Sequence, residues 1–332
     1  MKVAKYGMSC RASYRIALTL GLLLGLPYAG LNAQAYPTKP VRVVLPTAAG
    51  SLSDSLSRLV FSKVSETLGQ QFIVDNRPGA GGLIGAEAVA KAPPDGYTLL
   101  VAVNSIMVVN PLVYSKVAYD PIRDFEPVSM LAKISEVLIV NPSLGVKTLD
   151  EFIRLAKARP RQITYGSGGN GHVMHLMMEL FQRKAGIQLV HVPYKGPSPA
   201  MQAMISGEVD ALNVGLGLAR PHIASGKVLA LAKTGMPAKD ALPTVPALTT
   251  FYPNAEYIPW LAVFAPKGVS KDIVVKLNTE IGKALASSDI RTRMGDMDLV
   301  PIGGSPNDLD QTLRADLAVT RELVRSIGLK LD

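Results

Sequence analysis

The sequence predicts an α/β protein built from two lobes, and three observations lead to this prediction. Short apolar runs alternate with amphipathic helical patterns between residues 41 and 103. The same alternation returns between residues 136 and 232. The chain has 332 residues, which is more than one hydrophobic core usually serves. We therefore expect two cores with the chain crossing between them.

Residues 1–35 have the pattern of a secretory signal peptide. Four basic residues and no acidic one precede an apolar run from Ile16 to Leu26, which is too short to span a membrane comfortably. The small residues of Ala33-Gln34-Ala35 then supply a cleavage pattern. Cleavage after Ala35 would remove Cys10, the one cysteine, and lower the formal net charge from +9 to +5 because four basic residues leave. We expect an exported chain without a lipid anchor, a disulfide or a thiol nucleophile.

The first alternating set begins with the apolar run Val41–Leu45, which is typical of a strand buried on both faces. A loop and a capping-box pattern from Ser51 to Asp54 lead into a helical stripe that should stop at Gly69. Further strands are expected at residues 72–74 and 97–103, with a helix between them that ends near residue 91. This order predicts a parallel sheet with right-handed crossovers.

The second set begins with the strand-like run Glu136–Val140 and a helix capped by Thr148. Its other strands are expected at residues 163–165, 189–192, 211–214 and 228–232, and its other helices after residue 172 and at 199–206. An irregular segment follows, and then a buried strand at 261–265 and helices at 271–287 and 307–327. We place the first lobe at residues 36–137 plus 255–332 and the second at 138–254. The patterns leave open where the last helices pack.

The stretch from Ile163 to Met178 is the strongest candidate for a binding site. A glycine-rich loop at residues 166–171 lies between a predicted strand and a predicted helix start. Glycines let the backbone approach a ligand closely, and the helix start offers N–H groups and a partial positive charge. This combination favours an anionic ligand. A tight turn without a ligand is the simpler alternative.

Other chemistries for this stretch are weaker. Gly166, Gly168 and Gly171 match a dinucleotide fingerprint, but the next strand ends in HVPYK without the acidic residue that a nicotinamide site needs. We expect no cofactor. His172 and His175 share a helical face, yet the chain has no HExxH pattern, so no metal site is expected and a solvated face is the simpler explanation.

Nucleophilic catalysis and nucleic-acid binding are also weakly supported. Ser167 lies near histidines in the sequence, but no G-x-S-x-G elbow is present. The positive charge is scattered instead of forming a stripe with aromatic residues, which argues against nucleic acid. Loops of small residues follow several predicted strands, and in open parallel sheets such loops meet at the edge where ligands bind.

Several motifs in this chain resemble those of the substrate-binding receptors of tripartite tricarboxylate transporters, the Bug receptors. The resemblance runs from Tyr36 to the C-terminus and is most specific in five segments: NRPGAGG from Asn76, APPDGYTL from Ala92, YDPIRDFEPV from Tyr119, VPYKG from Val192, and Trp260 ahead of Ala265-Pro266. It implies a type II-like periplasmic binding protein, in which two α/β lobes close around a small organic acid in a central cleft. It also implies no enzymatic activity, and a membrane permease or a sensor protein as partner of a monomer. An exported enzyme acting on a small carboxylate in the same cleft is the alternative.

The resemblance places the ligand site at residues 46–54, at 165–175 and near 213. The candidate ligand-binding residues are Thr47, Ala48, Ala49, Gly50, Ser51, Asp54, Asn104, Ser167, Gly169, Asn170, Gly171, His172, His175, Asn213 and Val214. The chain departs from the family pattern at three places: residues 47–51 read TAAGS where members usually carry FPPGG, His172 replaces a threonine, and Val214 replaces a frequent aspartate. Because Val214 removes a partner for a cation, we expect a carboxylate ligand without an ammonium group.

Overall fold

The computed structural model describes residues 1, 36–235, 242–253, 255 and 257–331. Nearly all of the predicted signal peptide lies outside these residues. Contacts divide the chain into the units Met1–Thr38 and Lys39–Asp332, and the elements below belong to the second unit. Within the described residues, no helix combines the length and the apolar character that crossing a membrane requires.

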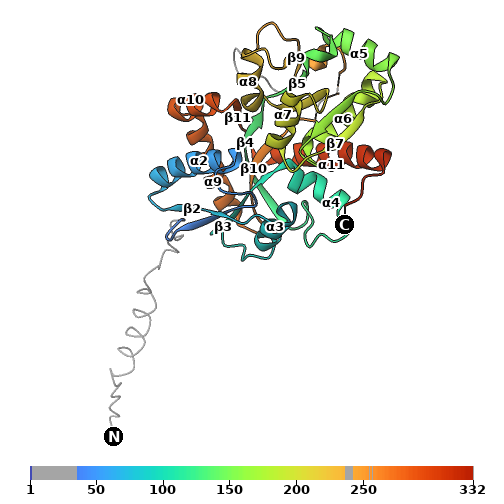
Figure 1. The fold of residues 1–332 in the computed structure, drawn as a ribbon. Coiled ribbons are helices and arrows are strands. Elements are labelled where there is room, and N and C mark those ends of the chain that lie inside the picture. Colours follow the sequence, from blue (N-terminus) through green and yellow to red (C-terminus); the bar gives the residue numbers. More distant parts are fainter. Residues whose placement is uncertain (2–35, 236–241, 254, 256, 332) are drawn as a thin grey trace. The chain divides into compact units, whose positions relative to one another are not determined.

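The first sheet has six strands in the order β11-β4-β10-β3-β1-β2 (Figure 1). The three strands of the first alternating set are parallel, as predicted: β1 (Val41–Leu45), β2 (Phe72–Asn76) and β3 (Thr98–Val103). Three more strands join antiparallel to their neighbours: β4 (Phe125–Ile134), β10 (Trp260–Pro266) and β11 (Leu299–Gly303). The parallel arrangement predicted for the first set is therefore confirmed, and the complete sheet is mixed because later segments of the chain return to join it.

The helices around the first sheet come from both ends of the chain. They are α2 (Leu52–Leu68), α3 (Leu83–Ala90), α4 (Asn110–Val113), α9 (Lys271–Ala286), α10 (Ser288–Asp296) and α11 (Pro306–Ile327), with short turns at Ala80–Gly82 and Ser105–Val109. Both α9 and α11 pack against β4, and α9 also packs against α2. The last helices therefore cover the first sheet, which the sequence had left open.

The second sheet has five strands in the order β7-β6-β8-β5-β9. β6 is parallel to β7 and β8, whereas β5 is antiparallel to β8 and β9. The strands are β5 (Glu136–Val140), β6 (Thr164–Ser167), β7 (Val190–Pro193), β8 (Ala211–Gly215) and β9 (Leu229–Thr234). The helices are α5 (Leu149–Ala158), α6 (Val173–Ala185), α7 (Pro197–Ser206) and α8 (Leu216–Ala224), with short turns at Pro142–Leu144 and Leu248–Thr250. Two mixed sheets therefore carry the two α/β lobes.

The chain first passes from one sheet to the other at Ser135, which separates β4 from β5, and it returns between β9 and β10. The Ser135 carbonyl accepts a hydrogen bond from the Leu216 N–H at 2.8 Å, and the Ser135 N–H donates to the Asp298 carbonyl at 3.3 Å. Two side chains of the second sheet's helices also reach segments of the first. The guanidinium of Arg220 on α8 forms an ion pair with Asp298, and Arg183 on α6 donates to Ser326 Oγ on α11 at 2.7 Å.

Candidate functional site

Segments of both sheets enclose a cavity of about 960 Å³. Its lining includes the loop after β1 and the first turn of α2, and, from the other sheet, the first residues of α6. The lining positions are 46–48, 51–53, 78–79, 81–82, 103–106, 134–136, 172–174, 197–198, 214–215, 217–218, 259 and 296–298. A cavity of this size accommodates a small organic molecule.

The structure divides the candidate ligand-binding residues into two groups. Those that line the cavity are Thr47, Ala48, Ser51, Asn104, His172 and Val214. Those outside the lining are Ala49, Gly50, Asp54, Ser167, Gly169, Asn170, Gly171, His175 and Asn213. Several members of the second group hold the first group in place through hydrogen bonds.

The first turn of α2 faces the cavity because its cap is built from the loop after β1. Ser51 is the N-cap, and its hydroxyl accepts a hydrogen bond from the Asp54 N–H at 3.3 Å and lies 3.2 Å from Thr47 Oγ1. Asp54 is buried, and its carboxylate accepts from the Gly50 N–H at 2.9 Å and from Asn76 Nδ2 at 3.0 Å. Asp54 therefore shapes the loop around Ser51 from behind. This is close to the capping box that the sequence pattern predicts. In a capping box the Asp54 carboxylate would accept from the Ser51 N–H, whereas here it accepts from the Gly50 N–H.

Opposing influences act on the pKa of Asp54. Burial alone would raise this pKa, but hydrogen bonds from Arg58, Gly50 and Asn76 and the charge of Arg58 hold it below its ordinary value. The carboxylate is thus charged at neutral pH. A charged carboxylate that accepts several protein donors is well suited to fix a loop.

The first turn of α6 faces the same cavity. Its N-cap is His172, a half-buried residue whose Nδ1 accepts a hydrogen bond from the Met174 N–H at 3.3 Å. The imidazole lies against the backbone of Gly168, where any side chain would come within 2.9 Å of the ring. Burial lowers the pKa of His172 to about 4. Burial therefore keeps the imidazole of His172 neutral at neutral pH.

Behind this loop lies a buried layer of side chains that the sequence did not bring together. His175 is 7% exposed, so the expectation of a solvated histidine face is wrong for this residue. Its Nδ1 accepts a hydrogen bond from the Gly171 N–H at 3.2 Å, and its ring stacks on His191 of β7 with centroids 4.0 Å apart. His191 Nε2 lies 2.6 Å from Ser167 Oγ.

The Ser167–His191 contact resembles half of a catalytic pair, but its burial argues against that role. Ser167 has no exposed surface, and its hydroxyl is also hydrogen-bonded to the backbone of Gly169 at 3.1 Å. A nucleophile must reach the ligand, and Ser167 does not line the cavity. Within the part of the chain that the structure describes, no group of three or more His, Cys, Asp or Glu side chains is placed to hold a metal ion.

Comparisons with known proteins agree with this geometry. The family model described as "Tripartite tricarboxylate transporter family receptor" matches residues 56–329. The chain belongs to this family. Protein BugT of Bordetella pertussis is 33% identical over 305 residues, which cover 91% of this chain and 94% of BugT.

Two solved structures with named ligands are also similar to this receptor. A protein of R. palustris solved with adipate is 34% identical, with a TM-score of 0.77, over 89% of this chain and 99% of that one. MatC from Rhodopseudomonas palustris, with bound malate, is 31% identical, with a TM-score of 0.73, over 87% and 100% of the two chains. The family consists of periplasmic solute-binding receptors, and its fold agrees with the two lobes seen here.

Adjacent residues of β8 in the receptor have different surroundings, because successive side chains of a strand point to opposite faces. Val214 lines the cavity. Asn213 is fully buried, and its amide donates to Glu136 Oε2 at 2.6 Å and accepts from Thr234 Oγ1 at 2.8 Å. Asn213 therefore orients Glu136 from within the sheet.

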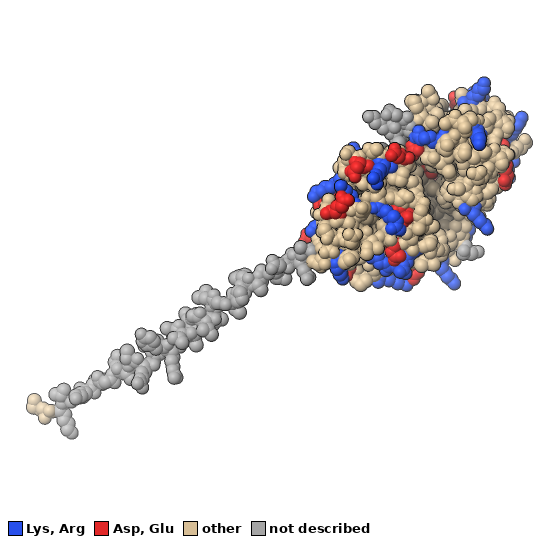
Figure 2. Space-filling model, turned by 60° about the vertical axis from the view of Figure 1, so that its left-hand side comes forward, with Lys and Arg blue, Asp and Glu red and all other residues tan. Residues whose placement is uncertain are grey.

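The charges around the receptor's cavity come from acids. Glu136, Asp296 and Asp298 reach the lining, and no lysine or arginine is among the described lining residues. Asp298 forms an ion pair with Arg220. A positive potential toward an anion must therefore come from helix starts, among them those of α2 and α6. On the outer surface basic and acidic side chains are interspersed, as Figure 2 shows for one face.

Sequence reasoning missed several lining residues of the receptor. The segment 78–82 was noted only as part of the NRPGAGG motif, although its glycines carry the signal of a close approach. At Gly82, with φ of +94°, any Cβ would lie 2.6 Å from the Ile106 side chain. Glu136 and Asp298 gave no such signal, since one lies inside a predicted strand and the other follows a helix, α10, that was not predicted.

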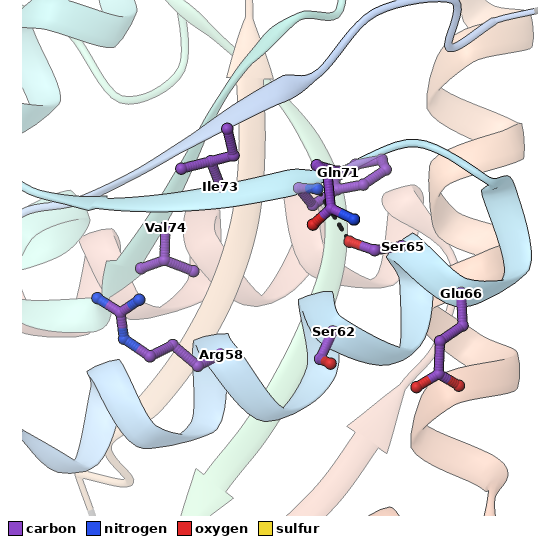
Figure 3. A pocket seen from close by; sticks show the side chains of 8 residues that line it. Arg58, Ser62, Ser65, Glu66, Gln71, Ile73 and Val74 are labelled. Atoms are coloured by element: carbon purple, nitrogen blue, oxygen red, sulfur yellow. Dashed lines mark hydrogen bonds between the residues drawn. The ribbon is translucent and has the colours of Figure 1, made fainter.

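A second cavity, of about 540 Å³, lies between α2 and β2 (Figure 3). Its lining comes from one helix and the neighbouring edge strand: Arg58, Ser62, Ser65, Glu66 and the residues 71–74. Arg58 is already hydrogen-bonded to Asp54 and Asn76, at 3.0 and 2.8 Å, and Ser65 Oγ accepts from the Phe72 N–H at 2.9 Å. The larger cavity, which both sheets line, is the better candidate for a receptor that closes on its ligand.

The position of His172 gives a prediction for pH dependence. Its pKa of about 4 in the free receptor should rise when a carboxylate binds beside it. Binding should then take up protons between the free and the bound pKa, and affinity should fall as pH rises through the bound value. Because the pKa of His172 in the free receptor is lowered, we expect this uptake at about pH 5.

Calorimetry in buffers of different ionisation enthalpy measures this uptake. We expect it at about pH 5, with little at about pH 7.5. His172→Thr is the control, since threonine also caps helices and the ligand's own protonation is the same for both proteins. Equal uptake by the wild type and the variant would show that His172 does not contact the ligand.

Proposed function

We propose that the receptor captures a small organic carboxylate in the larger cavity. The observation that carries this proposal is that two helices, α2 and α6, begin at the lining of one cavity and come from different sheets. Each helix start offers N–H groups and a partial positive charge to an anion. The adipate and malate bound to two relatives belong to the same chemical class.

We further propose that the ligand passes from the receptor to a membrane permease of the tripartite tricarboxylate type, or is sensed by a protein that recognises the closed form. The family description supports such a partner. In this proposal the lobes comprise residues 36–137 plus 255–332 and residues 138–254. Both contribute cavity residues, so binding would shift the population toward the closed arrangement.

A panel of small acids tests the proposed ligand class. At least one of adipate, malate, succinate and glutarate should raise the melting temperature, because a ligand that binds only the folded form stabilises it by about 2.7 kcal/mol at a hundred times its Kd. Glutarate should bind more tightly than glutamate, since Val214 offers no partner to the ammonium group. If every acid leaves the melting temperature unchanged, or if amino acids alone bind, the proposed ligand class is wrong.

Matched variants locate the site. Ala48→Glu introduces a negative charge at an exposed lining residue beside the start of α2, and should weaken the affinity for the best acid about tenfold. Ser62→Glu makes a comparable change at an exposed position of the second cavity and should leave the affinity unchanged. The opposite pattern would place the site between α2 and β2.

Chemical analysis of the acid after incubation separates a receptor, which returns it unchanged, from an exported enzyme.

Export of this chain is part of the proposal. The signal-peptide pattern predicts a mature protein that starts at Tyr36, and the periplasmic location of its family supports this. Mass spectrometry of the protein recovered from the periplasm should give the mass of residues 36–332. Recovery of a periplasmic protein that retains residues 1–35 would contradict the predicted cleavage.

A further inference from the structure

A stack of three rings lies beneath the glycine-rich loop of the second sheet. The imidazoles of His175 on α6 and His191 on β7 are nearly parallel, at 6°, with centroids 4.0 Å apart. The ring of Tyr165 on β6 lies 4.9 Å from that of His191, because the parallel register of β6 and β7 places the two residues opposite each other. None of the three lines the cavity, so their effect on a ligand must pass through the residues above them.

Each imidazole is connected to one glycine of the loop. His175 Nδ1 accepts directly from the Gly171 N–H at 3.2 Å. His191 Nε2 lies 2.6 Å from Ser167 Oγ, and this hydroxyl accepts from the Gly169 N–H and donates to the Gly169 carbonyl, both at 3.1 Å. Gly169 and Gly171 have φ of +123° and +75°, and a glycine without supporting hydrogen bonds would also sample other conformations. Because the hydrogen bonds fix both glycines before binding, less conformational entropy is lost when the ligand binds.

The hydrogen bonds define the proton on one of the two rings. Because His175 Nδ1 is an acceptor, its proton is on Nε2, which lies 3.9 Å from Glu179 Oε1. The 2.6 Å contact between His191 Nε2 and Ser167 Oγ connects the two side chains whichever of them donates, since the direction depends on the tautomer of the ring. Burial lowers the pKa of each histidine to about 4, and the charge of His172 opposes protonation of His175. Both rings are therefore neutral at neutral pH.

We propose that His175 and His191 are positioning residues that fix the loop from Gly169 to Gly171 for ligand binding, His175 directly and His191 through Ser167. The inference rests on the proposed function, because the loop leads into the helix start that would meet the carboxylate. It differs from a ligand-contact role for His175, since both imidazoles lie behind the loop.

Amide exchange in the ligand-free receptor tests the positioning directly. His191 makes no hydrogen bond with Gly169. The variant His191→Phe keeps a stacking ring but removes the contact with Ser167. Faster exchange of the Gly169 amide in this variant would therefore show that His191 stabilises Gly169 through Ser167. We expect about tenfold faster exchange in this variant, and no faster exchange in the double variant with Ser167→Ala than in Ser167→Ala alone. The control is His222→Gln, which changes a histidine on α8. Unchanged exchange in His191→Phe would overturn the inference whether or not an acid binds.

Affinity for the best acid of the panel gives the second measurement. His191→Phe and Ser167→Ala should each weaken it about tenfold, and the double variant should lose no more than the larger single effect. If the two losses multiply, the residues act separately and the inference fails. If exchange responds as expected but the wild type binds no acid, the positioning stands and the proposed function falls.

A pH profile separates positioning from general packing. His175→Gln retains an acceptor for the Gly171 N–H but cannot be protonated. As pH falls toward 4, the wild type should lose affinity relative to this variant, because protonated His175 can no longer accept from Gly171. The ligand's carboxyl group, His172, His191, Tyr165 and Glu179 are present in both proteins, so the ratio of the two Kd values isolates His175. A ratio that does not change with pH would contradict the direct role of His175.

Discussion

Replacing Trp260 with alanine should lower the free energy of unfolding by about 3–5 kcal/mol, the usual cost of truncating a buried aromatic residue. Trp260 is 1% exposed at the start of β10, and β10 lies between β3 and β4 in the first sheet. Its indole N–H also donates to Asp316 Oδ2 on α11 at 2.7 Å. Trp260→Phe keeps most of the ring volume and should cost only about 1–2 kcal/mol. Because Trp260 is the one tryptophan, unfolding should be followed by circular dichroism.

The pH dependence of this effect has a defined sign. Burial raises the pKa of Asp316, although the Trp260 hydrogen bond and the charge of Lys133 oppose the rise. A raised folded-state pKa means that ionised Asp316 costs stability above that pKa, and that this cost disappears as pH falls below it. Without the indole donor the pKa rises further, so the Trp260→Phe penalty should be larger at neutral pH than at about pH 4. A penalty that is independent of pH would show that the indole hydrogen bond does not stabilise the ionised carboxylate of Asp316.

Replacing Arg220 with methionine should weaken ligand affinity by about 5- to 150-fold, the range of coupling free energies of 1–3 kcal/mol. Two guanidinium nitrogens of Arg220 contact the Asp298 carboxylate, with Nε at 3.1 Å from Oδ2. Arg220 belongs to a helix of the second sheet, and Asp298 to the segment that enters β11 of the first. Without the guanidinium, the buried Asp298 carboxylate is unpaired while the lobes are together and can be hydrated when they separate. The open population should therefore rise.

Calorimetry and small-angle scattering test this prediction together, since affinity should fall as the radius of gyration of the ligand-free receptor rises. The matched control is Arg123→Met, because Arg123 pairs with its neighbour Asp124 on the surface at 2.7 Å and connects no second element. Asp298→Asn in addition to Arg220→Met should recover part of the affinity, because the unpaired charge is then removed. Unchanged affinity in Arg220→Met would show that this ion pair does not couple the lobes to the ligand.

The strands that could be predicted from sequence are those with uninterrupted apolar runs. Val41–Leu45 was predicted with its observed bounds, because a strand buried on both faces leaves a continuous pattern. β4 was missed because Pro127 interrupts its pattern, and proline is rare inside sheets. The structure accommodates it at a shift of register between Val263 and Phe264 of the neighbouring β10. β11 was missed for a related reason, since Pro301 lies in it, and β11 is an edge strand where proline is tolerated.

The candidate site shows what local patterns can and cannot predict. The loops and helix starts around Ser51 and His172 follow from caps and glycines that lie close together in the sequence. The partnership of Ser167 with His191 spans 24 residues and depends on the register of two parallel strands. Likewise, the alternation of β8 leaves open which of Asn213 and Val214 faces the cavity until the position of the sheet is known.

The strand order of the first sheet also determines when this sheet can form during synthesis of the chain. β10 separates β3 from β4, so these two strands cannot be joined in the sheet until synthesis has passed residue 266, after every strand of the second sheet. Contacts between such distant segments form slowly, because the intervening chain must be closed into a loop first. An amino-terminal half that lacks β10 cannot complete this sheet. If the chain is exported as proposed above, late closure of the sheet would favour the unfolded state that passage through a secretion channel requires.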